Sequence, residues 1–264
     1  MSAITDRRVA AVVGALVADA AAQPLHWLYD EEKLKRIIGE KEEVEFWEPS
    51  QNPFYCIPTG SFSCYGDQAY VILKSLVENK GVNLEALKKL TYDFFGPQSS
   101  YEDPENARYV VGKEDKINVK PTLPIHRPWR NGSIKHFLSN MEAGKEESGS
   151  ESDEQIDCVL RMVPVCALYA GHPEMLSRVE EVLRVTQSND LPVTIGLAAA
   201  RILEQFILHG PNTNALNAVL SDLSNSRRNN PQELDQTVAG FIREVQKLSS
   251  IDHHSAVTKN FQKN

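Results

Sequence analysis

The sequence predicts an all-α protein, built as one multi-helix domain over residues 1–264 rather than as a string of modules. Apolar residues recur at intervals of three and four along most of the chain, which is the spacing of one face of a helix. Strand-like alternation is scarce. Hydrophobic residues make up 41% and charged residues 24% of the chain, the balance of a globular protein with one sizeable core.

The first predicted helix has the helical spacing of a core helix. Its apolar positions are Val9, Val12, Val13, Leu16 and Ala20. A second segment opens at Gly66-Asp67, runs to Val77 and is apolar on nearly every face, so we expect it to be buried. A shorter amphipathic helix follows, with Leu84, Leu87, Leu90 and Phe94 on one side.

Two irregular stretches interrupt the helices. Residues 96–131 are rich in proline and polar residues, and so long a stretch is typical of a functional or disordered loop. A short helix is predicted around Ser133 to Met141. The Gly-, Ser- and Glu-rich run 144–153 then predicts a mobile surface loop within the domain.

Four further helices complete the predicted bundle. Ile156 to Ala170 is apolar along one face, with a bend at Pro164, and Pro173 opens the next helix. Asp190 is the expected N-cap of a helix over 191–208, which is apolar on almost all sides and is the predicted centre of the bundle. The last helix begins after Pro231 and carries apolar residues up to Leu248 at helical spacing.

The charge and the cysteines exclude several classes of protein. A net charge of −8 argues against nucleic-acid partners, because binding to phosphates needs clustered Lys and Arg. The four cysteines show neither C-x-x-C spacing nor the density of a disulfide scaffold, so we expect reduced thiols and no zinc site.

The N-terminal segment superficially resembles a secretory signal. Arg7-Arg8 precedes an apolar run, but Asp6 lies in the basic region and the run consists of Ala, Val and Gly. The helical spacing favours a core helix instead. Since no stretch of about twenty apolar residues exists, we expect no membrane partner and a cytoplasmic location.

Three small residues, Gly14, Ala18 and Ala22, form one stripe on the first helix, which allows a helix or a ligand to approach its backbone. The run from Gly14 to His26, Gly-Ala-Leu-Val-Ala-Asp-Ala-Ala-Ala-Gln-Pro-Leu-His, resembles the opening motif of the ADP-ribosylglycohydrolase family. That motif reads Gly-Ala-x-x-Gly-Asp-Ala-x-Gly-x-Pro-x-Glu.

Three more matches follow in the family's order over residues 7–208. Tyr65-Gly66-Asp67-Gln68 lies where the family has Thr-Asp-Asp-Thr, 160–164 resembles Met-Arg-x-x-Pro, and Thr186-Gln187 lies where Thr-His is common. The details resemble the J-type crystallins and the selenoprotein J group. The resemblance implies an all-α orthogonal bundle with a cleft for ADP-ribose, and hydrolysis of the glycosidic bond of ADP-ribose. It also implies a pair of magnesium ions, bound by the paired aspartates and a C-terminal Asp-x-Asp, and a catalytic glutamate that closes the opening motif.

Several residues that the family's chemistry requires are replaced in this sequence. His26 stands at the glutamate position, Gly66 replaces the first paired aspartate, and the last sixty or so residues contain no Asp-x-Asp. Magnesium prefers carboxylate oxygens, so we predict weak or absent magnesium binding, with Asp67 as the remaining metal ligand. His26 is the candidate catalytic residue.

Asp19, Gln68 and Arg161 are the candidate ligand-binding residues. Simpler roles stay open: Asp67 as a helix N-cap, Asp19 as a structural residue, His26 as a pocket-wall histidine and Arg161 as a helix-fixing ion pair. We assign no metal to His253-His254.

Three functions are therefore considered. The first is a catalytically degenerate member of the fold with a structural, crystallin-like role or a role in binding an ADP-ribose-like ligand. The second is an active magnesium-dependent hydrolase rebuilt around Asp67 and His26, and the third is a helical interaction scaffold. We also expect the C-terminal part of the family fold to be missing; truncation at a selenocysteine codon is one hypothesis for its cause, which the sequence alone does not decide. The oligomeric state is not predicted.

Overall fold

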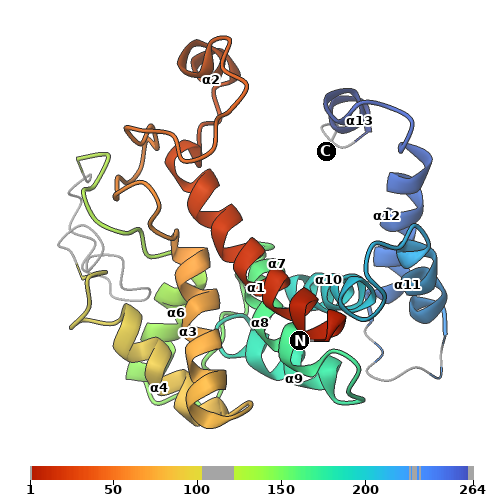
Figure 1. Cartoon of the computed structure of the whole chain (residues 1–264). Helices are drawn as coiled ribbons and strands as arrows, with labels where there is room; N and C mark the ends of the chain where they lie inside the picture. Colours follow the sequence, from red (N-terminus) through yellow and green to blue (C-terminus); the bar gives the residue numbers. More distant parts are fainter. Residues whose placement is uncertain (1, 103–121, 226, 228–230, 232, 261–264) are drawn as a thin grey trace.

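The computed structural model describes residues 2–102, 122–225, 227, 231 and 233–260, and it confirms the all-α class. Within these residues there is no β-strand, only isolated bridges that join Tyr55 to Ile125 and Ser150 to Gln187. The elements, shown in Figure 1, are α1 Ala3–Ala22, η1 Gln23–Leu25, α2 Glu31–Ile38, α3 Cys64–Asn79, α4 Leu84–Phe95, α6 Gly132–Glu142, α7 Cys158–Arg161, α8 Val163–Tyr169, α9 Met175–Arg184, α10 Asp190–His209, α11 Ala215–Leu223, α12 Asp235–Lys247 and α13 His253–Asn260.

Side-chain caps set where several of these helices begin. Ser63 Oγ accepts from the N–H of Tyr65 at the start of α3, and Asn131 caps α6 in the same way through Ile134. Two sequence predictions are corrected here. The N-cap of α10 is Asn189, whose side chain accepts from Leu191 N–H at 2.9 Å, and Asp190 is the first helical residue. Asp67 lies within the first turn of α3 and is not its cap.

Helix α10 is the centre of the bundle, as predicted. It packs against α1, α7, α8, α9, α11 and α12. Val193, Leu197 and Ala200 on its inner side are fully buried. Gly196 allows the closest approach, because a Cβ there would lie 2.6 Å from Leu183 Cδ1.

The predicted bend in the 156–170 helix is confirmed as a break. The chain forms α7, passes through Met162, and continues as α8. Pro164 lies in the first turn of α8, where its missing N–H leaves no helical hydrogen bond unmade.

The core helix predicted near the N-terminus is less covered than expected. In α1, Val9 and Val13 are each 53% exposed, and Ala20 alone among the described residues of the helix is buried. The helix packs through its other side, where Ala11, Val12 and Ala15 contact the core. Helix α3 was expected to be buried, and Val71, Ile72 and Leu76 are buried, but Tyr70 and Val77 are 40% and 69% exposed.

The 144–153 run is exposed at residues 144–147 and 151–152 but is buried in between, at residues 148–150. Ser148, Gly149 and Ser150 are buried, and Ser148 Oγ donates to Val185 O at 2.8 Å. Gly149 is pressed against the turn between α9 and α10, since a Cβ there would lie 2.8 Å from Ser188 N. The prediction of a mobile loop is therefore wrong for residues 148–150, because their small side chains fit against backbone.

The C-terminal helices form a second, smaller cluster. Val219, Leu223 and Ala239 are buried between α11 and α12, apart from the main core. The predicted amphipathic helix before Leu248 is present as α12, but Phe241 and Val245 on it are 59% and 53% exposed. In Figure 1 these blue helices stand to one side of the bundle.

Two helices, α1 with the following turn and α10, reach the length and hydropathy of a membrane span. Half of the α10 window is buried inside the protein. Arg7 and Arg8 attach α1 to the bundle: Arg7 donates to Ile207 O and Leu208 O, and Arg8 donates to Ala170 O. The absence of a membrane partner stays a prediction.

Candidate functional site

The first two motifs that resemble the family's sequence, at 14–26 and 65–68, meet where α1 passes the start of α3. The carboxylate of Asp19 accepts two hydrogen bonds from Ser63, from its N–H at 2.8 Å and from its hydroxyl at 2.5 Å. A Cβ on residue 66 would lie only 2.7 Å from Asp19 Cγ, so the carboxylate fills the space beside Gly66. Burial raises the pKa of Asp19, against the lowering effect of the Ser63 bonds.

Asp67, one residue further along, faces a different partner. The hydroxyl of Tyr101, which is fully buried, donates to Asp67 Oδ2 at 2.6 Å. Burial, with a smaller contribution from the nearby Asp19, raises the pKa of Asp67 to about 6 against the lowering effect of the Tyr101 hydrogen bond. The carboxyl group is therefore partly protonated near neutral pH.

His26 lies at the end of the opening motif, within an aromatic cluster. Its Nδ1 is 3.3 Å from Tyr55 Oη, and its ring centroid is 4.6 Å from that of Trp27 and 5.7 Å from that of Tyr65. Burial lowers the pKa of His26 to about 4. The imidazole is thus neutral at pH 7, when it can accept or donate one hydrogen bond but carries no charge.

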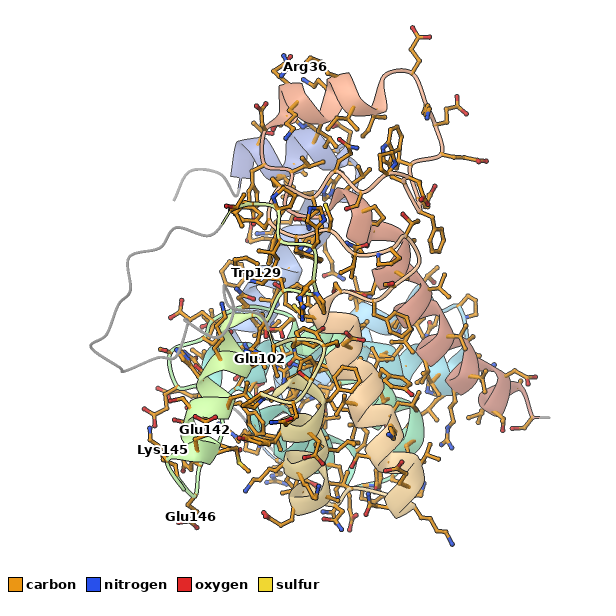
Figure 2. All side chains as sticks on the ribbon, turned by 90° about the vertical axis from the view of Figure 1, so that its left-hand side faces the viewer. Arg36, Glu102, Trp129, Glu142, Lys145 and Glu146 are labelled. Atoms are coloured by element: carbon orange, nitrogen blue, oxygen red, sulfur yellow. The ribbon has the colours of Figure 1, made fainter. Side chains whose placement is uncertain are left out.

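The aromatic cluster comprises His26, Trp27, Phe54, Tyr55, Tyr65 and Trp129. Trp27 is its hub, with ring centroids 5.3 Å from Phe54, 5.5 Å from Tyr55 and 6.0 Å from Trp129. Trp27 also has φ of 62°, a left-handed conformation that bulky residues rarely adopt and that is typical of functional sites. Figure 2 shows Trp129 on the face turned to the viewer, above Glu102.

One lysine lies at the edge of this cluster. Lys135 Nζ is 5.0 Å from the ring centroid of Trp129, a cation–π distance. Burial lowers the pKa of Lys135 to about 8, and Arg130 contributes in the same direction. The side chain is still mostly protonated at pH 7, so the cluster has a cation at one edge and carboxylates near the other.

Gln68 and Arg161 lie deeper, under the start of α3. Arg161 is 1% exposed; its Nε is 3.4 Å from Asp157 Oδ2, and its Nη1 donates to Thr186 Oγ1 at 2.5 Å. It also donates to the side chain of Gln187. Gln68 is 3% exposed and donates to Cys64 O at 3.2 Å. Both residues line one small internal cavity, separate from the surface at Asp19.

Two adjoining grooves open over the site. The larger, about 930 Å³, runs between α1 and α7–α8 and reaches Asp19, Trp27 and Tyr65. The smaller, about 770 Å³, lies beside His26. They share Trp27, Tyr29 and Ala18, a member of the predicted small-residue stripe. Apolar walls with a few polar groups are typical of sites for small molecules.

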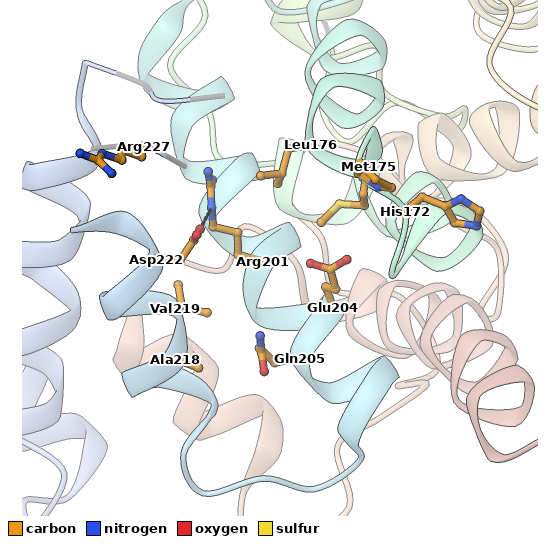
Figure 3. Close-up of a pocket in the computed structure, with 11 residues that line it drawn as sticks. His172, Met175, Leu176, Arg201, Glu204, Gln205, Ala218, Val219, Asp222 and Arg227 are labelled. Carbon is orange, nitrogen blue, oxygen red and sulfur yellow. Dashed lines mark hydrogen bonds and ion pairs between the residues drawn. The ribbon is translucent and has the colours of Figure 1, made fainter. Parts of the chain in front are cut away.

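A third cavity of about 450 Å³ lies between α9, α10 and α11 (Figure 3). Arg201 and Asp222 form an ion pair of 2.7 Å in its wall, and Glu204 accepts from Gly171 N–H at 2.8 Å. None of the five predicted site residues lines this cavity.

The comparisons with known proteins agree with the geometry. The sequence model of ADP-ribosylglycohydrolase matches residues 1–261. The chain belongs to the ADP-ribosylglycohydrolase family. It is 40% identical over 217 residues to crystallin J1A of Tripedalia cystophora, covering 82% of this chain and 63% of the crystallin. It is 39% identical over 224 residues to crystallin J1B of the same organism, covering 85% and 65%.

A solved structure described as an ADP-ribosylglycohydrolase-related protein complex shares the fold. Its TM-score is 0.54 at 15% identity, over 94% of this chain and 77% of that chain. The chain spans less than two thirds of the length of the crystallins that it matches. These similarities therefore establish the family and the fold, and the activity of the whole protein is treated below as a proposal.

The residues of this site do not fit a magnesium pair of the kind that the family implies. Position 66 has no carboxylate, and its side-chain space is taken by Asp19. Asp19 is bound by Ser63 and Asp67 by Tyr101. In the part of the chain that the structure describes, no three His, Cys, Asp or Glu residues form a group that could hold a metal ion.

The structure thus brings Asp19, Asp67 and His26 to one region and places Gln68 and Arg161 beneath it. The sequence reasoning missed Tyr101, the partner of Asp67, and missed Trp129 and Tyr55 in the aromatic cluster. The density of aromatic residues around positions 26–29 and 54–55 was an available signal.

Proposed function

We propose that this chain is a non-hydrolytic member of the family that binds an ADP-ribose-like ligand without magnesium. The observation that carries this proposal is the packing of Asp19 against Gly66. Gly66 lacks the carboxylate of the family's first paired aspartate, and the Asp19 side chain fills the space that such a carboxylate would need. A lone remaining ligand, Asp67, cannot neutralise two magnesium ions. The neutral His26 supplies no anionic group to stabilise a positive transition state.

The ligand class follows from the chemistry of the aromatic cluster. Nucleobases stack on aromatic faces such as that of Trp27. Asp19, which lines the larger groove, can accept hydrogen bonds from ribose hydroxyls, and Lys135 at the Trp129 edge offers a positive charge to a diphosphate. The two grooves that meet at Trp27 and Tyr29 have the volume for such a molecule.

Calorimetry with ADP-ribose, with and without millimolar magnesium, tests this proposal. We expect saturable binding that is the same in both buffers, that is lost in Trp27→Ala and that is kept in Trp47→Ala. Trp47 is a matched control, because it is a tryptophan outside the cluster that pairs with Lys41 at 4.3 Å. ADP-ribosylated arginine and serine peptides should be cleaved only at background level.

Three outcomes separate the alternatives. Magnesium-dependent release of ADP-ribose that Asp67→Ala abolishes would mean an active hydrolase. No saturable binding by the folded protein would favour a purely structural, crystallin-like role. A melting temperature raised by magnesium and insensitive to Asp67→Ala would place a metal elsewhere, since a ligand that binds only the folded state raises its stability. The cytoplasmic location stays a prediction.

A further inference from the structure

One buried side chain sets the backbone that carries two members of the aromatic cluster. Asn52 is 2% exposed, and its Oδ1 accepts from the N–H of Phe54 at 2.9 Å and from the N–H of Tyr55 at 3.2 Å. Residues 46–63 form no helix or strand, only the isolated bridge of Tyr55 to Ile125. In such an irregular segment, an asparagine that accepts from the backbone two and three residues ahead fixes a turn.

This turn is attached to the two segments that carry the tryptophans of the cluster. Before it, the N–H of Gln51 donates to Pro24 O at 2.8 Å, which holds the turn beside η1. After it, the N–H of Ile125 donates to Phe54 O at 3.0 Å, in the segment that leads to Trp129. The turn therefore lies at the junction of the end of the opening motif and the second tryptophan segment.

The ring contacts of the cluster fix the plane of Trp27. The rings of Phe54, Tyr55 and Trp129 stand at 90°, 84° and 89° to it, and edge-to-face pairs of this kind are favoured between aromatic side chains. The left-handed backbone of Trp27 is strained, and such a conformation persists only where the surrounding structure determines it. Two of the three perpendicular neighbours, Phe54 and Tyr55, depend on the turn at Asn52.

We propose that Asn52 is a positioning residue for the ligand site. Its side-chain oxygen sets Phe54 and Tyr55, and their rings hold the plane of Trp27, on which a nucleobase stacks. Asn52 itself lines neither groove, so it acts on the ligand only through the cluster. Its effect on ligand binding rests on the function proposed above, whereas its effect on the geometry of the cluster does not.

The test follows the cluster itself, in a Trp47→Phe background of the full chain. The chain has three tryptophans, so the two that remain, Trp27 and Trp129, both belong to the cluster. Near-UV circular dichroism reports the fixed packing of aromatic rings, and acrylamide quenching of fluorescence reports their exposure. In Asn52→Ala we expect the near-UV signal of the tryptophans to be lost and quenching to increase, while the far-UV signal of the helices is kept.

Further variants separate positioning from general loss of stability. Asn52→Asp should keep the near-UV signal, because a carboxylate oxygen accepts the same two bonds and replaces Nδ2, which has no hydrogen-bond partner in the described part of the chain. Asn52→Ser, a shorter and neutral acceptor, should lie between the Asp and Ala variants and replaces either one that does not fold. Asn83→Ala is the matched control: Asn83 accepts from the N–H of Ala86 at the start of α4, outside the cluster, and its loss should leave the signal unchanged.

Calorimetry with ADP-ribose on the same proteins completes the test. The affinity should fall roughly tenfold in Asn52→Ala and recover in Asn52→Asp. An unchanged near-UV signal in folded Asn52→Ala, or an equal loss in Asn52→Asp or Asn83→Ala, overturns the positioning role. A lost signal with full ADP-ribose affinity overturns its link to the ligand. No binding by the parent chain, with the signal lost in Asn52→Ala and kept in Asn52→Asp, refutes the proposed function and supports the positioning of the cluster.

Discussion

The carboxylate of Asp19 occupies the space that a side chain on residue 66 would need, so Gly66 and Asp19 form one packing unit. Asp19 comes from α1 and Gly66 from α3, and Ser63 holds the carboxylate in place with two hydrogen bonds. The loss of the family's first paired aspartate is therefore accommodated by the packing of two helices. Restoring that aspartate alone would create a clash rather than a metal site.

Gly66→Ala should lower the free energy of unfolding by about 1–3 kcal/mol through overpacking against Asp19. In an Asp19→Ala background the same substitution should cost much less, because the clashing group is gone. Urea unfolding of the four proteins measures this coupling. Gly14→Ala is the control: nothing lies within 4 Å of its added methyl group, so it should stabilise the helix slightly. Additive effects of Gly66→Ala and Asp19→Ala would contradict the packing unit.

Asp67 should make the protein less stable as pH rises through about 6. Its pKa is higher in the folded than in the unfolded chain, so its favourable contribution is complete below about pH 4 and is lost above pH 6. With allowance for solvent screening, the loss is about 1–2 kcal/mol. Asp67→Asn, which keeps an acceptor for Tyr101, should flatten this dependence in unfolding experiments between pH 4 and 7. An unchanged slope in the variant would assign the effect to other groups.

His26 should titrate far below ordinary histidines. Burial lowers its pKa to about 4, so the folded protein disfavours the charged ring, and the associated stability is present above about pH 6.5 and lost as pH falls toward 4. The Hε1 resonance in NMR, assigned by its absence in His26→Gln, should shift with a midpoint near 4. A midpoint above 6 would show that the ring is exposed to solvent or paired with a carboxylate.

Arg161 should be a residue of the folded core rather than a contact for the ligand. Arg161→Met leaves Asp157 buried without its cation and should cost about 3–5 kcal/mol. The cost should be smaller at pH 5 than at pH 8, because burial raises the pKa of Asp157 and protonation removes its charge. The double variant Arg161→Met with Asp157→Leu should regain much of the stability. A well-folded Arg161→Met protein that has lost only ADP-ribose binding would refute this role.

The helices could be predicted from the sequence because their signals are local. Periodic apolar residues and side chains such as Ser63 act within one turn, and Pro164 can start a helix but cannot lie in its interior without breaking it. The resemblance to the family implied a common site for Asp19, Asp67 and His26. These relationships need no knowledge of what covers a helix from outside.

The exposure of individual side chains and their hydrogen-bond partners could not be predicted, because both depend on segments far away in the sequence. Val13 has the spacing of a core residue, yet no helix of the described chain buries it. Ser148 to Ser150 read as a solvated loop but dock against the backbone of the α9–α10 turn. Tyr101 reaches Asp67 from an irregular segment, where the chain offers no periodicity to indicate direction.

The anchoring of Arg7 has a consequence for how the chain is made. Its guanidinium donates to Ile207 and Leu208, residues 200 and 201 positions later. A ribosome adding 5–20 residues per second needs roughly 10–40 s to synthesise that interval. During this time the apolar first helix has emerged while the carbonyl groups that hold its start do not yet exist, so α1 reaches its native anchorage only after α10 has been synthesised.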